Sequence, residues 1–240
     1  MSISEKLTTI AENQEKVYEA GKTKEWSDFW EKYQSLNLSQ PYERTDYIMA
    51  FCGGGWNRMT FYPKYNMKVS NAERMFQFFG QYTGETFNLA SRLKEINITI
   101  DYSNCTRFYY CFGGSFIDTL PTIDMTSATS ASTNYSAFSS SFLHTVEKFI
   151  FSENTDLTGA FVSADKLKNI NEIEGTIGKT VDLKSCLLTK ASITNVVNAL
   201  SGNVSGITCT FKKTAKEAAF TTDEWNTLIA TKSNWTFSLV

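Results

Sequence analysis

The chain has 240 residues, with 23 basic and 25 acidic side chains, a formal net charge of −2 and a pI near 5.6. Such a length suits one domain with appendages or two small domains. The charge balance lacks the basic excess that nucleic-acid binding usually needs. No apolar run reaches the roughly 18 to 20 residues of a membrane span, and no signal peptide is visible at the start. We therefore expect no nucleic-acid partner and no membrane insertion.

Residues 1–36 are predicted to form two helices. Ser2 and Glu5 have the spacing of a capping box at the start of the first helix. The second helix carries an aromatic stripe at positions i, i+3, i+4 and i+7, formed by Trp26, Phe29, Trp30 and Tyr33. This stripe must be covered, and packing on the rest of the chain and docking to a partner are equally open interpretations. In the second interpretation, residues 1–36 dock to another protein or to an identical subunit.

Residues 37–70 are rich in glycine, proline and aromatic side chains. Gly53, Gly54 and Gly55 are not followed by the Lys-Ser/Thr pair of a phosphate-binding loop, so we expect no nucleotide site. We interpret this segment as a cap over the open end of the domain that follows, because an uncovered end would expose core and strand edges.

Residues 71–178 contain apolar triplets that recur with a nearly fixed period. The triplets are Ile117, Leu120, Ile123; then Leu143, Val146, Phe149; then Leu167, Ile170, Ile173, with the pair Leu93 and Ile96 before them. Their first members are 24, 26 and 24 residues apart, a period typical of leucine-rich-repeat solenoids. An aromatic anchor precedes each full triplet, at Phe112, Phe138 and Phe161. We expect these anchors to fill the convex side of the coil.

Each unit is expected to contribute one short strand to a single parallel sheet. The predicted strands lie near residues 96–100, 122–125, 148–151 and 172–174. Because side chains alternate between the faces of a strand, six residues are predicted to point outward as candidate ligand-binding positions: Thr122, Asp124, Lys148, Ile150, Glu172 and Glu174. A solvated face without a ligand is the alternative interpretation. Asp101, Asp124 and Glu174 are the carboxylates that could converge between neighbouring strands.

Two later segments differ in pattern. The Ser/Thr-rich stretch 126–141 is predicted to be a long loop held by Tyr135 and Phe138 as apolar anchors. Residues 179–240 are predicted to form a small αβ cap of helix, strand, helix and strand. Its elements are expected at 189–200, at 207–211, after a capping box at Thr221 and Glu224, and at 235–239.

Cysteine and histidine offer little chemistry. The five cysteines are irregularly spaced and are predicted to be buried, free hydrophobic residues, so we expect no metal and no cofactor. His144 is the only histidine, and any Ser-His or Cys-His mechanism would have to use it. We assign it a surface or packing role, and therefore name no catalytic residue.

The chain resembles two groups of proteins. The Cys-Phe and Ala-Phe anchors and the strand at 117–123 are similar to those of BspA-type leucine-rich-repeat proteins. The opening Ile-Ala-Glu-Asn-Gln-Glu-Lys, the Gly-Trp-Asn at 55–57 and the closing Trp-Thr-Phe resemble proteins encoded by phages and prophages of gut Firmicutes. The resemblance implies a virion-associated protein of the tail, baseplate or fibre, docked by its N-terminus, and it carries over no catalytic residue.

The predicted fold class is therefore an α/β repeat: a short leucine-rich-repeat solenoid with an N-terminal helical segment and a C-terminal cap. The predicted function is a non-enzymatic structural or adhesion component of a phage particle. Expected partners are other virion proteins or identical subunits in a homo-oligomer, together with a glycan or protein of the host surface. Two alternatives stay open: a bacterial leucine-rich-repeat surface adhesin, and a carbohydrate-active enzyme that uses carboxylates of the repeat face.

Overall fold

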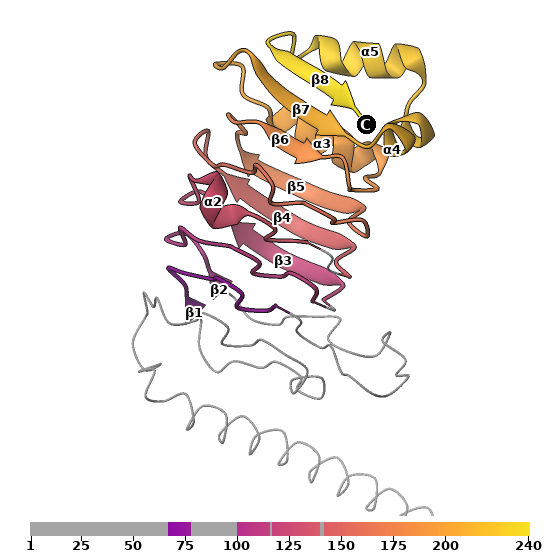
Figure 1. Ribbon diagram of the computed structural model, residues 1–240. Coiled ribbons are helices and arrows are strands. Elements are labelled where there is room, and N and C mark those ends of the chain that lie inside the picture. The colour runs from indigo at the N-terminus through magenta and orange to yellow at the C-terminus, as the bar shows by residue number, and fades with distance from the viewer. Residues whose placement is uncertain (1–66, 78–99, 116, 140–141) are drawn as a thin grey trace, which may run out of the picture. The chain divides into compact units, whose positions relative to one another are not determined.

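A computed structural model describes residues 67–77, 100–115, 117–139 and 142–240, which all belong to the compact unit Tyr42–Val240. These residues form an α/β fold with parallel strands (Figure 1). Its strands and helices, in chain order, are β1 (Met67–Lys68), β2 (Ile100–Asp101), β3 (Thr119–Asp124), α2 (Ala131–Asn134), β4 (Thr145–Phe151), β5 (Asn169–Gly175), β6 (Val181–Leu183), α3 (Lys190–Ala199), β7 (Ile207–Phe211), α4 (Lys213–Ala219), α5 (Thr222–Ala230) and β8 (Trp235–Leu239). The predicted segment 1–36 and most of the predicted cap 37–70 lie outside the described residues.

The strands β3, β4 and β5 form one parallel sheet in the order of the chain. Leu120 pairs with Val146, and Val146 pairs with Ile170, so the middle residues of the three apolar triplets lie side by side. The same register aligns Ile123 with Phe149. The predicted parallel pairing of these segments is confirmed. Each strand starts about three residues before its predicted start.

The first predicted strand is wrong in its pairing. Ile100 and Asp101 form β2, which pairs with Met67 and Lys68 of β1 in a separate two-stranded sheet. The strand ends at Asp101, whose Oδ1 accepts hydrogen bonds from both the N–H and the hydroxyl of Ser103, at 3.0 and 2.6 Å. This local turn competes with continuation of the strand.

A column of stacked phenylalanine rings fills the interior behind the turns. Phe76, Phe112, Phe138 and Phe161 stack in sequence, with centroid distances of 5.5, 5.6 and 5.0 Å and interplanar angles of 4°, 8° and 14°. The predicted anchor role of the last three is confirmed by their complete or near-complete burial. The residue two positions before each ring has a positive φ of 52–75°, so the backbone makes the same sharp turn at every level.

Helix α3 covers the open edge of the three-stranded sheet. Ser192 accepts the Ile170 N–H at 2.8 Å, and Asn195 donates to the carbonyls of Ile170 and Asn171 at 3.0 and 2.9 Å. These side chains satisfy groups that a further strand would otherwise bind. The predicted helix at 189–200 is confirmed, and it begins at Thr189, whose side chain accepts the Ser192 N–H.

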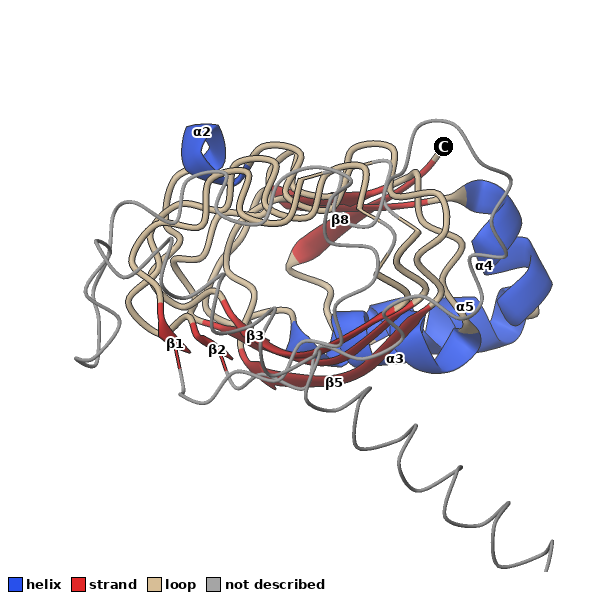
Figure 2. Ribbon diagram, turned by 90° about the horizontal axis from the view of Figure 1, so that it is seen from below, coloured by secondary structure: helices blue, strands red, loops and turns tan. Residues whose placement is uncertain are grey.

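The C-terminal residues form a second parallel sheet in the order β6, β7 and β8. In Figure 2, β3 and β5 line one side of the structure and β8 lies toward the opposite side. The predicted strands at 207–211 and 235–239 and the capping box of Thr221 and Glu224 are confirmed. The predicted order of helix, strand, helix and strand is incomplete, because it omits β6 and α4.

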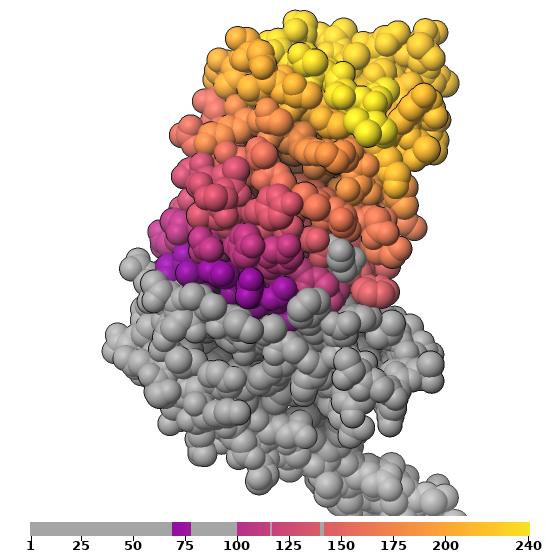
Figure 3. All heavy atoms as spheres, viewed as in Figure 1, coloured from indigo at the N-terminus to yellow at the C-terminus, as the bar shows by residue number. Residues whose placement is uncertain are grey.

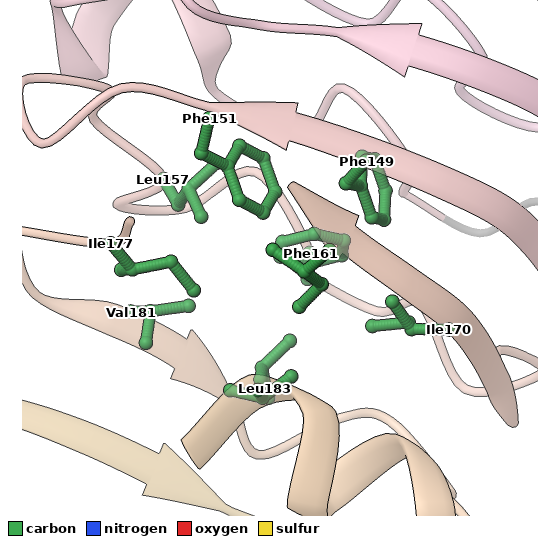
Figure 4. Close-up of a pocket in the computed structure, with 10 residues that line it drawn as sticks. Phe149, Phe151, Leu157, Phe161, Ile170, Ile177, Val181 and Leu183 are labelled. Atoms are coloured by element: carbon green, nitrogen blue, oxygen red, sulfur yellow. The ribbon is translucent and has the colours of Figure 1, made fainter. Parts of the chain in front are cut away.

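The interior between the two sheets is continuous and apolar. Phe149, Phe161 and Leu183 face one another from β4, a turn and β6, as Figure 4 shows. The gap that they leave holds only ≈ 10 Å³, near the lower limit for one water molecule. In Figure 3 the described residues follow one another in bands from indigo to yellow, so the levels of the structure follow one another in the order of the chain.

Cys105, Cys111, Cys186 and Cys209 are buried and free, as predicted, and Cys52 lies outside the described residues. Burial raises the pKa of each of these four thiols, to about 12 for Cys105. Because the thiolate is the reactive form, these four side chains are poor nucleophiles at neutral pH.

Candidate functional site

The structure brings the six predicted ligand-binding residues together on one sheet. Thr122, Lys148 and Glu172 form one row across β3, β4 and β5. The next row contains the other three candidates: Asp124, Ile150 and Glu174. Parallel strand pairing creates both rows, because the three strands contribute equivalent positions.

Lys148 lies at the centre of this face, between two carboxylates. Its Nζ is 2.9 Å from Glu172 Oε1 and 2.6 Å from Glu174 Oε2. Side-chain hydrogen bonds, with Glu172 first and Glu174 second, raise the pKa of Lys148 to about 12. The ammonium therefore stays charged at neutral pH, and two of the predicted binding carboxylates are paired with it.

The carboxylates considered for a hydrolase all have partners within the chain. Asp101 and Asp124 each accept hydrogen bonds from a hydroxyl and an N–H two residues later, through Ser103 and Thr126. Glu174 pairs with Lys148. These contacts make the strand face a hydrogen-bonded polar surface, with Asp101 and Asp124 holding turns at the ends of strands.

The only histidine lies at the surface near the beginning of β4. His144 Nδ1 is 2.7 Å from Asp118 Oδ1, and the His144 and Asp118 side chains are 38% and 53% exposed. The backbone joins the same two residues, because the His144 N–H donates to the Asp118 carbonyl at 2.8 Å. This pair links two neighbouring levels of the structure.

Two tyrosine rings on the turns lie against glycine residues. A methyl group on Gly159 would come within 2.6 Å of Tyr135 Cδ2, and one on Gly113 within 2.8 Å of Tyr110 Cδ1. The Tyr110 N–H donates to the Tyr135 carbonyl, so the two tyrosines belong to adjacent turns. Tyr135 is 45% exposed, and its predicted role as an apolar anchor in the loop is therefore wrong. The glycines leave room for rings that lie flat on the turns.

Tyr109 is part of the same surface but is enclosed by charged groups. Its ring contacts Tyr110 at a centroid distance of 4.8 Å, in an edge-to-face arrangement. The guanidinium groups of Arg74 and Arg107 lie 5.8 and 5.4 Å from its centroid, a cation–π geometry. Arg107 also pairs with Glu73 at 2.6 Å. Sequence reasoning missed this surface, because no local spacing connects tyrosines on different turns.

A second surface missed by sequence reasoning is an open cleft of ≈ 520 Å³. Its lining residues come from four connections between strands and helices: Phe142, Ser163, Asp165, Lys166, Lys184, Ser185 and Lys212. Two of the lysines have carboxylate neighbours, since Lys166 lies 3.2 Å from Asp165 and Lys184 lies 2.7 Å from Asp182. The cleft concentrates positive charge on a chain whose net charge is negative.

Other predicted features are not placed by the described residues. The aromatic stripe of Trp26, Phe29, Trp30 and Tyr33 lies outside them, so its docking role stays a prediction. Within the described part of the chain, no cluster of three or more His, Cys, Asp and Glu side chains could hold a metal ion. No helix among the described residues combines the length and apolar character needed to cross a membrane.

Comparison of the chain with known protein families, curated proteins and solved structures finds no match.

Proposed function

We propose that this protein is a non-enzymatic structural and adhesion component of a phage particle, which displays a leucine-rich-repeat-type solenoid toward the host surface. Support for the solenoid comes from two features that coincide. The apolar triplets recur every 24 to 26 residues, and their middle members, Leu120, Val146 and Ile170, pair in register. Support for a phage origin comes from the resemblance of the two ends of the chain to phage and prophage proteins.

The observation that carries the adhesive role is the pair of tyrosines laid over glycines. Tyr110 and Tyr135 are attached to turns whose backbones are hydrogen-bonded to the neighbouring turns. A flat, partly exposed ring on a fixed backbone loses little conformational entropy when a ligand stacks on it. The apolar face of a sugar ring is a suitable ligand for such a surface. Many copies on one particle would convert weak single contacts into firm attachment.

The Arg and Glu side chains beside Tyr109 add polar groups to this contact surface. Arg107 and Glu73 pair with each other while remaining partly exposed, at 36% and 21%. They can therefore bind sugar hydroxyls at the edge of a stacked ring. The polar rows on β3, β4 and β5 remain a second proposed contact face, centred on Lys148.

Replacing Tyr135 by alanine is expected to weaken binding to host cells by about tenfold, which corresponds to about 1.4 kcal/mol and is typical of an aromatic contact residue. The measurement is the retention of the purified, fluorescently labelled full chain on a panel of Firmicutes cells and on their isolated cell walls. Tyr135→Phe keeps the ring and is expected to bind like the natural protein. Equal retention of the alanine variant and the natural protein would remove the tyrosine surface from the proposal.

Two further observations separate this function from the alternatives. A phage component is expected to have genes for tail or capsid proteins beside its own, whereas a bacterial adhesin is expected beside genes for secretion or cell-wall functions. Incubation with host capsular and cell-wall polysaccharides is expected to release no new reducing ends. Release that depends on Glu174 would favour the carbohydrate-active enzyme instead.

A further inference from the structure

The lysine cleft places like charges next to each other in a way that needs compensation. In the parallel pairing of β6 with β7, Leu183 is opposite Phe211. Lys184 and Lys212 directly follow these two residues, so their backbones are neighbours at the end of adjacent strands, where the spacing is about 4.8 Å. Neighbouring like charges in a sheet are destabilising. An anion beside the pair, from the protein or from a ligand, would offset this repulsion.

The carboxylates of the cleft compensate only part of this charge. The described residues of its lining include three lysines and one aspartate, a formal excess of two positive charges. Asp182 adds one partner, at 2.7 Å from Lys184, and a side-chain hydrogen bond from this aspartate raises the pKa of Lys184. Lys212 is of intermediate exposure, and its ammonium group forms no ion pair or hydrogen bond with the described residues. Lys212 is thus the positive group with the greatest need for an external anion.

Ser163 and Ser185 also line the cleft and supply hydroxyl groups. Ser185 Oγ accepts the Ser163 N–H at 3.2 Å, which leaves its own hydroxyl proton available to a ligand. Ser163 has a φ of 56°, a conformation that is costly for a residue other than glycine. Phe142, which is 38% exposed, provides an apolar edge to the same cleft.

We propose that this cleft binds a phosphate group. Lysine ammonium groups act as point charges and suit the oxygens of a tetrahedral phosphate. A planar carboxylate is often bound by the paired donors of arginine, and none of the described residues that line this cleft is an arginine. The phosphate can belong to a small free molecule or to a phosphodiester in a surface polymer. If the phosphate belongs to a surface polymer, the proposal rests on the adhesive function proposed above. If it belongs to a small free molecule, the proposal is independent of that function.

The test is a titration of the full chain by isothermal calorimetry with sodium tripolyphosphate, a poly(glycerol phosphate) polymer and polygalacturonate. Lys212→Gln and Lys184→Gln are each expected to weaken tripolyphosphate binding by about tenfold or more, the loss typical of a hydrogen bond to a charged group. Lys213→Gln is the matched control: it removes the same charge from the next residue, which does not line the cleft, and it is expected to change the affinity less than twofold. Binding of the natural protein is expected to weaken as salt is added.

Thermal unfolding provides a second measurement that does not depend on a measurable binding heat. Tripolyphosphate is expected to raise the Tm of the natural protein and of Lys213→Gln, because a ligand of the folded state stabilises it. The Tm of Lys212→Gln is expected to stay nearly constant. Without the anion, Lys212→Gln is expected to be at least as stable as the natural protein, because it removes the repulsion from Lys184.

The outcomes distinguish the alternatives. Equal weakening by Lys213→Gln and Lys212→Gln would show only non-specific charge attraction and would overturn the site. Polygalacturonate binding as strong as phosphate binding, with the same dependence on Lys212, would overturn the choice of phosphate. Binding of tripolyphosphate but not of the polymer would assign the cleft to a small phosphate compound, whatever the result of the Tyr135 experiment on host cells.

Discussion

Replacing Gly175 by alanine is expected to lower the free energy of unfolding by about 3 kcal/mol or more. Gly175 ends β5 with a φ of 84°, a conformation that costs residues with a Cβ about 1–2 kcal/mol. In addition, a Cβ at this position would lie 2.0 Å from the carbonyl oxygen of Phe151, its partner on β4. The backbone of one strand would have to move to relieve this contact. Urea unfolding followed by circular dichroism measures the effect.

Two other glycines provide graded controls for this variant. Gly206 also has a positive φ, of 72°, but no heavy atom lies within 4 Å of its added Cβ. Gly206→Ala is therefore expected to cost only the conformational term, about 1–2 kcal/mol. Gly202 has neither constraint, so Gly202→Ala is expected to be neutral or stabilising by up to about 1 kcal/mol. The same cost at Gly175 and Gly206 would contradict the proposed contact with Phe151.

Replacing Phe138 by alanine is expected to destabilise the protein by about 3–5 kcal/mol, the usual range for a buried phenylalanine. Phe138 is fully buried and stacks between Phe112 and Phe161, at 5.6 and 5.0 Å. It also meets the edge of Phe149 at 5.5 Å. Alanine would leave a cavity that interrupts the column of rings and separates the turns from the sheet. Chemical denaturation of the purified variant measures this cost.

Phe138→Leu restores part of the lost volume and is expected to cost clearly less than alanine. Leu187→Ala removes an apolar side chain that is 39% exposed and is expected to change stability by about 0.5 kcal/mol or less. A cost below about 1 kcal/mol for Phe138→Ala would mean that the column can close around the gap. In that case the rings would not be the main support of the turns that carry Tyr110 and Tyr135.

The elements with strong local signals were predictable from the sequence. The capping box of Thr221 and Glu224 begins α5, and the apolar spacing at 189–200 corresponds to α3. The period of the triplets predicted the parallel pairing of β3, β4 and β5. In each case the spacing of a few residues in the sequence is enough to predict the element.

The errors occurred where that rule of spacing was too simple. The first two buried residues of β3 and of β4 are three apart, as in Leu120 with Ile123 and Val146 with Phe149. Strict alternation cannot describe this pattern, so the predicted strands started too late. The pairing of β2 with β1 was missed for a different reason. Met67 and Lys68 of β1 lie in the segment 37–70, which was interpreted as a cap, so no strand was predicted there for β2 to pair with.

The candidate sites also differ in how much of each could be predicted from the sequence. The row of Thr122, Lys148 and Glu172 follows from the period and from strand alternation, but its ion pairs depend on distances that spacing alone cannot provide. The lysine cleft had no sequence signal, since Lys184 and Lys212 are 28 residues apart with unrelated neighbours. Only the register of β6 with β7 makes them adjacent.

The sequence alone thus determined which segments are buried and that the strands of residues 119–175 are parallel, because the hydrophobic period expresses burial directly. The tertiary structure decided which exposed side chains meet. Tyr135 lies over Gly159, and Lys184 lies beside Lys212, through the stacking of turns and the register of strands. Surface contacts of this kind arise between segments about 24 to 28 residues apart, and exposed positions carry no hydrophobic periodicity that could reveal them.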